Sequence, residues 1–126
     1  MWNRHDFAFE TTLASRSFAP WLRARQTEGY RVHLAFLSLP NVELAIARVR
    51  ERVRLGGHDV PEPVIRRRYI AGLRTFFAVY RHMADGWQML DNSDATATRL
   101  IAFGRVDNPL TIVDERGWNT LMEHAR

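Results

Sequence analysis

The stretch Arg31-Val32-His33-Leu34-Ala35-Phe36-Leu37 is apolar along nearly its whole length and predicts a strand. Continuous apolar strands are typical of a parallel sheet that is covered on both faces. Asn41 follows at a position where its side chain can cap a helix. Apolar residues near the helical period then predict a helix over residues 42–53. A strand that leads into a capped helix indicates an α/β fold.

Strand and helix signals alternate on both sides of this unit. Further strands are predicted at residues 7–9, 87–90, 100–103 and 110–113, and further helices at residues 20–28, from 61 to about 85, and 114–124. We therefore expect one α/β domain over residues 1–126, with a mostly parallel sheet and helices on both of its faces.

The composition excludes several classes of chemistry. The 126 residues include no cysteine, so a disulfide framework, a thiolate metal site and a cysteine nucleophile are excluded. All 18 basic residues are arginines, so the chain has no phosphate-loop lysine and no Schiff-base lysine. The net charge of +4 suits phosphate ligands or nucleic acid. No stretch is apolar over the roughly 18 residues of a membrane span, and the first residues do not resemble a signal peptide. We expect a cytoplasmic protein with no membrane partner.

Residues 48–68 are the most informative for function. Arginines recur at four-residue spacing in two rows, Arg48 with Arg52 and Arg50 with Arg54, on neighbouring faces of one helix. Gly56-Gly57 predicts a turn, and three more arginines follow at residues 66–68. Because arginine is suited to bidentate contacts with phosphate, a helical hairpin over about residues 42–84 could close over a nucleotide. The alternative is a solvated basic face on which arginines pair with Glu43, Glu51 and Glu62.

Two further candidate sites follow predicted strands. Ligands bind outside the carboxyl ends of strands in open parallel sheets. Glu10 could there accept a hydrogen bond from a substrate hydroxyl or act as a base, and Thr11 and Thr12 could donate to phosphate or sugar oxygens. These three side chains could equally cap the next helix. Asn92, in the stretch Asp91-Asn92-Ser93, could contact a base or ribose, or belong to an ordinary turn.

The remaining polar residues give weaker signals. His58 follows two glycines and could contact phosphate or order the turn by hydrogen bonding. The five histidines show no spacing of the HxxxH kind, so we predict no metal site. The chain contains no Gly-rich loop of the GxxxxGK[ST] type.

Three segments together resemble the zeta-toxin-like family of P-loop kinases. They are Phe7-Ala8-Phe9-Glu10-Thr11-Thr12-Leu13-Ala14, then residues 44–53 (LAIARVRERV), then Gly56-Gly57-His58-Asp59-Val60-Pro61 with Ile65-Arg66-Arg67-Arg68-Tyr69. The Asp91-Asn92-Ser93 turn is similar as well. Order and spacing match over about residues 5–104, and GGHxVP with RRRY is the more specific part.

The resemblance implies a P-loop kinase-like fold and a phosphoryl transfer. The donor would be ATP or GTP with Mg²⁺, and in the better-known branch the acceptor is a hydroxyl of UDP-N-acetylglucosamine. Glu10, Thr11 and Thr12 would lie on the acceptor side. Arg52 and Arg67 would contact the transferred phosphate, with Arg54 and Arg68 as close rivals, and His58 and Asn92 would lie near the nucleotide.

The sequence departs from the family pattern because it has neither the phosphate loop nor a lysine. In the family, the strand that carries this loop lies in the middle of the sheet. Its loss would leave unpaired backbone beside the strand at residues 7–10 or the strand at 32–37. We therefore expect the carboxyl-terminal portion of such a kinase, with negligible activity alone.

Two alternatives remain open. The chain could be a non-catalytic binding module that pairs with an antitoxin or with a chain that carries the phosphate loop. It could also bind nucleic acid through its arginines, which predicts a steep salt dependence. We rank nucleic acid last, because most aromatic residues fall on apolar faces of predicted elements rather than among the arginines.

Overall fold

The computed structural model describes residues 15–126. The helices are α1 (Ala19–Thr27), α2 (Val42–Arg54), α3 (Glu62–Thr75), α4 (Arg81–Met83) and α5 (Glu115–His124). The strands are β1 (His33–Ser38), β2 (Gly86–Asp91), β3 (Arg99–Arg105) and β4 (Thr111–Ile112). A 3₁₀ turn (Arg16–Phe18) precedes α1, and a π-helical segment (Phe76–Tyr80) joins α3 to α4. The strand predicted at residues 7–9 lies outside the described residues.

The four strands form one mixed sheet in the order β1-β2-β3-β4. Strands β1 and β2 are parallel, whereas β3 runs antiparallel to both β2 and β4. The α/β class is thus confirmed, but the expectation of a mostly parallel sheet is corrected. The reason lies in the connections. The α2–α3 pair links β1 to β2, whereas residues 92–98 and 106–110 are loops too short for a crossover helix.

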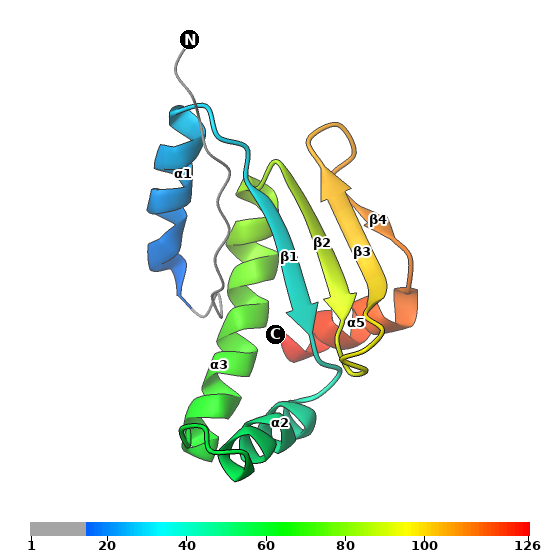
Figure 1. Cartoon of the computed structure of the whole chain (residues 1–126). Helices are drawn as coiled ribbons and strands as arrows, with labels where there is room; N and C mark the ends of the chain where they lie inside the picture. The colour runs from blue at the N-terminus through cyan, green and yellow to red at the C-terminus, as the bar shows by residue number, and fades with distance from the viewer. Residues whose placement is uncertain (1–14) are drawn as a thin grey trace.

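The helices that pack on this sheet lie on one of its faces (Figure 1). Leu34 and Phe36 point from β1 toward those helices and pack against the core. Ala35 and Leu37 point to the opposite face, where Leu37 is 56% exposed. The prediction of helices on both faces is therefore not met within residues 15–126. Helix α2 lies beyond the ends of the strands instead of on the sheet (Figure 1).

Aromatic side chains dominate the core under the sheet. Phe76 is fully buried, with its ring centroid 4.7 Å from that of Phe36 and 5.4 Å from that of Trp87. Trp118 of α5 lies 5.0 Å from Phe77 in an edge-to-face contact. The expectation that most aromatics belong to the core is confirmed within residues 15–126. The side chains named here hold the π-helical segment and α5 against β1 and β2.

Local signals end and begin α2 as the sequence predicts. The Asn41 side chain accepts a hydrogen bond from the Leu44 amide at 2.9 Å and caps the helix. At the other end Gly56 has φ +98°, a conformation that favours glycine. The Gly56 amide donates to the Val53 carbonyl at 2.9 Å and the Gly57 amide to the Arg52 carbonyl at 2.8 Å, which is a Schellman motif. This turn starts the return of the chain into α3.

Candidate functional site at the carboxyl edge

The parallel strands β1 and β2 end side by side at Ser38 and Asp91, and we call this end of the sheet the carboxyl edge. Ser38 is buried, and its hydroxyl donates to the Leu90 carbonyl at 2.8 Å. The Asn92 amide donates to the Ser38 carbonyl at 2.8 Å. These bonds continue the pairing past the last strand residue, so the turn after β2 begins in a fixed position.

Two carboxylates at this edge share one arginine. Arg99 donates to Asp91 at 2.9 Å and to Asp114 at 2.7 Å. Burial alone would raise the pKa of Asp91, but hydrogen bonds from Ser93 and the charge of Arg99 outweigh it and lower the pKa. The bond from Arg99, together with one from the Gly117 amide, also lowers the pKa of Asp114. Both groups are therefore held as carboxylates at neutral pH.

A small cavity of about 210 Å³ opens beside these carboxylates, between the strand ends and the start of α5. Its polar lining comes from Ser38, Asp91, Arg99, Asp114 and Arg116, and Ile101 and Leu121 form part of its apolar wall.

Helices α2 and α3, with the loop of residues 55–61, form an arginine hairpin that leaves the sheet at the carboxyl edge (Figure 1). Residues 42–75 contain eight arginines and four acidic residues, so this segment carries the whole net charge of +4. The remainder of the chain is neutral by formal charge. The hairpin is thus the part of the molecule on which anions would concentrate.

Several hairpin arginines are paired with acids, as one of the two sequence interpretations expects. Arg50 and Arg66 both contact Glu62, at 3.3 and 2.8 Å, and so join α2 to the start of α3. Arg66 also lies 3.9 Å from Glu43. Arg54 binds Glu51 one turn back at 2.5 Å. The hydrogen bonds from Arg66 and Arg54 lower the pKa of Glu62 and Glu51 respectively.

Other predicted arginines carry no such pair. The side chains of Arg52, Arg67 and Arg68 make no hydrogen bond or ion pair with any residue from 15 to 126. Arg52 lies about 6 Å along α2 from Arg48, on the same side of the helix. Arg67 follows buried Ile65 by two residues, a rotation of about 200°, and so points away from the core. Arg52 and Arg67 share no hydrogen-bond or ion-pair partner within these residues.

The remaining predicted residues fall in different places. His58 is exposed in the hairpin loop. The backbone of Asn92 is fixed at the carboxyl edge, where its carbonyl accepts a hydrogen bond from Arg48. Glu10, Thr11 and Thr12 lie outside the described residues.

Two residues at the base of the hairpin have contacts that the sequence analysis missed. Arg48 donates through one nitrogen to the carbonyls of Asn92 and of Ser93, the latter at 2.9 Å. The Tyr69 hydroxyl donates to the Leu39 carbonyl at 2.8 Å and lies 3.1 Å from Nδ1 of His124. Burial, with a smaller contribution from the charge of Glu43, raises the pKa of Tyr69 to about 12. These contacts span 30 to 55 residues of sequence, so no local spacing could have indicated them.

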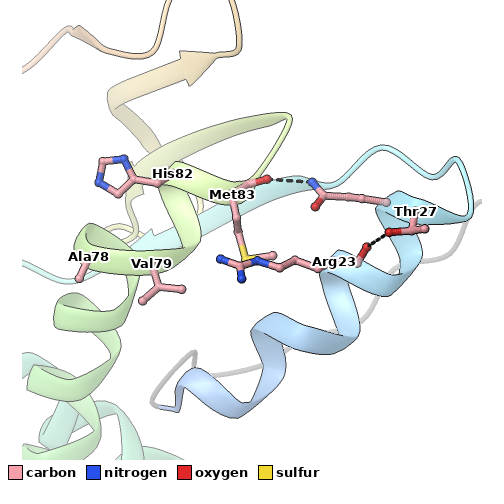
Figure 2. A pocket seen from close by; sticks show the side chains of 7 residues that line it. Arg23, Thr27, Ala78, Val79, His82 and Met83 are labelled. Carbon is pink, nitrogen blue, oxygen red and sulfur yellow. Dashed lines mark hydrogen bonds between the residues drawn. The ribbon is translucent and has the colours of Figure 1, made fainter.

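A second hollow, of about 660 Å³, lies near the other end of the strands between α1 and the end of the α3–α4 segment (Figure 2). Arg23, Thr27, Val79, His82 and Met83 line it. The Gln26 side chain crosses beside it and donates to the Met83 carbonyl at 2.8 Å. None of the predicted site residues lines this hollow.

Residues 15–126 hold neither a candidate metal site nor a candidate membrane span. No three histidine or acidic side chains there lie close enough together to hold a metal ion. No helix in that part of the chain is long and apolar enough to cross a membrane.

The mixed sheet, with a helical hairpin inserted between two parallel strands, is consistent with a P-loop kinase-like α/β protein. The family model described as Zeta toxin matches residues 1–120, and this chain belongs to that family.

Part of the chain is also similar in sequence to a bacterial protein. An uncharacterized protein of Haemophilus influenzae (strain ATCC 51907 / DSM 11121 / KW20 / Rd) is 33% identical over 63 residues, which make up 50% of this chain and 45% of that protein. The match thus spans about half the length of this curated relative. No solved structure matches the chain significantly.

Proposed function

We propose that this chain supplies the hairpin and acceptor side of a phosphotransferase. The reaction would move the γ-phosphoryl group of ATP or GTP, with Mg²⁺, to a hydroxyl of a small molecule such as UDP-N-acetylglucosamine. The acceptor oxygen would attack the γ-phosphorus while the bond to the β–γ bridging oxygen breaks and a nucleoside diphosphate leaves. Membership of the zeta toxin family supports the kinase class.

One structural observation carries the proposal further. Arg52, Arg67 and Arg68 lie exposed on the hairpin with no carboxylate partner among residues 15–126, so their guanidinium groups are available to phosphate oxygens. Phosphoryl transfer depends mainly on positioning and on neutralising charge, which such arginines supply. We assign Arg52 and Arg67 to the transferred phosphate and Arg68 to a neighbouring oxygen. Arg54 is the weaker rival, because Glu51 already holds its guanidinium.

The other assignments follow from position and from the family resemblance. Asn92 stands at the carboxyl edge, where a base or ribose would lie. His58 in the hairpin loop would contact a phosphate. Glu10 would take the proton of the acceptor hydroxyl, and Thr11 and Thr12 would hold the acceptor.

The first test concerns the arginines alone. Tripolyphosphate is a suitable probe because it tests charge recognition without a nucleoside. We expect the double change Arg52→Ala with Arg67→Ala to weaken its binding at least tenfold by calorimetry. Arg54→Ala is the matched control, since Glu51 occupies that side chain, and it should change binding less than twofold. Equal binding by the double variant and the unchanged protein would overturn the assignment.

The second test concerns catalysis. These 126 residues contain no GxxxxGK[ST] loop, so the chain alone should form no phosphorylated acceptor from ATP, Mg²⁺ and UDP-N-acetylglucosamine, as followed by mass spectrometry. Turnover above background that is lost in Arg67→Ala would contradict the expected inactivity.

A second candidate function is a non-catalytic binding module whose partner is an antitoxin or a chain that bears the phosphate loop. The face of the sheet opposite α3 and α5 is uncovered within residues 15–126, and Leu37 on it is 56% exposed, which favours this candidate. Co-purification of the expressed chain with the product of an adjacent gene, lost in Leu37→Asp, would support it. Elution as a monomer in the presence of that product would count against it.

A further inference from the structure

Arg48 makes an unusual contact for an arginine on a charged helix. Its Nη2 atom donates to two main-chain carbonyls, those of Asn92 and Ser93, instead of to an acid. Among residues 15–126 no carboxylate forms an ion pair with it. The charge of Arg48 acts on Asp94, whose pKa is lowered mainly by hydrogen bonds from Thr96 and in part by Arg48. A charged donor strengthens such bonds to carbonyls.

The two carbonyls belong to a turn whose amides are hydrogen-bonded to the ends of β1 and β2. The Asn92 amide donates to Ser38, and the Ser93 amide donates to Asp91 at 2.8 Å. The peptide groups around Asn92 are therefore fixed by β1 and β2 through their amides and by α2 through their carbonyls. Arg48 supplies the hydrogen bonds that connect this turn to the hairpin.

We propose that Arg48 is a positioning residue that makes the hairpin and the turn of residues 91–97 move as one unit. The inference rests on the proposed function, in which the hairpin holds the phosphates and Asn92 lies beside the nucleoside. Arg48 then keeps the phosphate-binding and nucleoside-binding sides of the site in fixed relation. Its effect passes through the backbone of the turn and needs no contact with substrate.

Amide hydrogen exchange, measured by NMR on the whole chain without any ligand, tests this coupling directly. Four amides of the turn are hydrogen-bonded and report on its opening: Asn92, Ser93, Thr96 and Ala97. Arg48→Ala should raise their exchange rates about tenfold and leave the amides of the β2–β3 ladder unchanged. Arg48→Lys, whose ammonium can still donate to carbonyls, should restore most of the protection. Arg54→Ala, on the same helix but paired within it, is the control and should have no effect.

The outcomes separate this inference from the proposed function, because no nucleotide is present. Unchanged exchange at the four amides in Arg48→Ala would overturn it. Equal acceleration throughout the sheet, or unfolding of both Arg48 variants, would assign Arg48 to general stability and would overturn it too. Failure of tripolyphosphate binding, by contrast, would affect only the phosphate assignment of Arg52 and Arg67.

Discussion

A single hydroxyl group, that of Tyr69, joins the base of the hairpin to two other parts of the fold. It donates to the carbonyl of Leu39, between β1 and α2, and lies next to His124 at the end of α5. A half-buried hydroxyl that holds a main-chain carbonyl contributes about 1 kcal/mol. Because Leu39 directly follows β1, this bond joins α3 to the segment that leads from the sheet into α2.

Tyr69→Phe removes this hydroxyl and leaves the ring. We expect the free energy of unfolding at pH 7 to fall by about 1 kcal/mol, measured by urea denaturation. Arg52→Ala, an exposed change without lost contacts, is the control and should stay within about 0.5 kcal/mol of the unchanged protein.

The raised pKa of Tyr69 predicts a dependence on alkaline pH. The folded state favours the neutral phenol, with a pKa of about 12 against about 10 in an unfolded chain. The contribution of the neutral Tyr69 phenol to the free energy of unfolding is therefore present below about pH 10 and is lost as the pH rises toward about 12. The stability difference between the unchanged protein and Tyr69→Phe should narrow over this range. If the free energies of unfolding of the unchanged protein and of Tyr69→Phe differ by the same amount throughout this pH range, the raised pKa of Tyr69 is contradicted.

At the scale of elements, the hairpin depends on how α2 begins and ends. The Asn41 cap satisfies an amide in the first turn, and the Gly56-Gly57 pair satisfies two carbonyls of the last turn. Neither device needs the sheet. Ion pairs from Arg50 and Arg66 to Glu62 then join the two helices, but these pairs are exposed and each contributes little. The end signals, more than the ion pairs, determine where the hairpin turns.

Asn41→Ala should destabilise the start of α2 by about 1 kcal/mol, because the Leu44 amide loses its acceptor. Urea denaturation followed by circular dichroism measures the change. Asn41→Asp keeps an acceptor oxygen at this position and should be close to the unchanged protein. If Asn41→Ala is as stable as Asn41→Asp and the unchanged protein, the cap makes no contribution to the free energy of unfolding.

Gly56→Ala tests the other end of α2. A Cβ atom at this position would meet nothing within 4 Å, so the only cost is the backbone strain of φ +98°. We expect a loss of about 1 kcal/mol in the free energy of unfolding. Leu55→Ala, at a side chain that is 72% exposed, is the neighbouring control. A neutral Gly56→Ala would show that the turn can adopt another conformation.

At the scale of the whole molecule, the two faces of the sheet differ in how far they are buried. One face is packed with aromatic side chains under α3 and α5, whereas the other leaves Leu37 exposed. Each strand of the parallel pair carries apolar residues on both faces, as strands covered on both sides usually do. An apolar face that is uncovered within the described residues favours association with another surface.

Leu37→Gln should therefore reduce self-association at high concentration in sedimentation velocity experiments. Because the side chain is 56% exposed, the free energy of unfolding should change by less than about 0.5 kcal/mol. Val106→Gln, at an 80% exposed position in the β3–β4 loop, is the control and should leave association unchanged. Equal association of all three proteins would rule out the sheet face as the contact.

The positions of most elements could be predicted from the sequence, and so could part of the site. The strand after Arg31, the Asn41 cap and the last helix after Asp114 all lie where local pattern places them. The pairing of arginines with Glu43, Glu51 and Glu62 was one of two interpretations, and the structure confirms it. The roles of Arg52, Arg67 and His58 remain predictions.

By itself the sequence determined the two ends of α2 and the approximate positions of the strands after residue 30, because caps, glycine turns and apolar periodicity act over a few residues. Its motifs also indicated the family. Only the tertiary structure decided the mixed direction of the sheet, the face left uncovered within residues 15–126 and the contacts of Arg48 and Tyr69. Those features depend on which distant segments meet. Arg48 binds main-chain carbonyls instead of an acid because the fold places Asn92, 44 residues later in the sequence, beside it. No local sequence pattern indicates that contact.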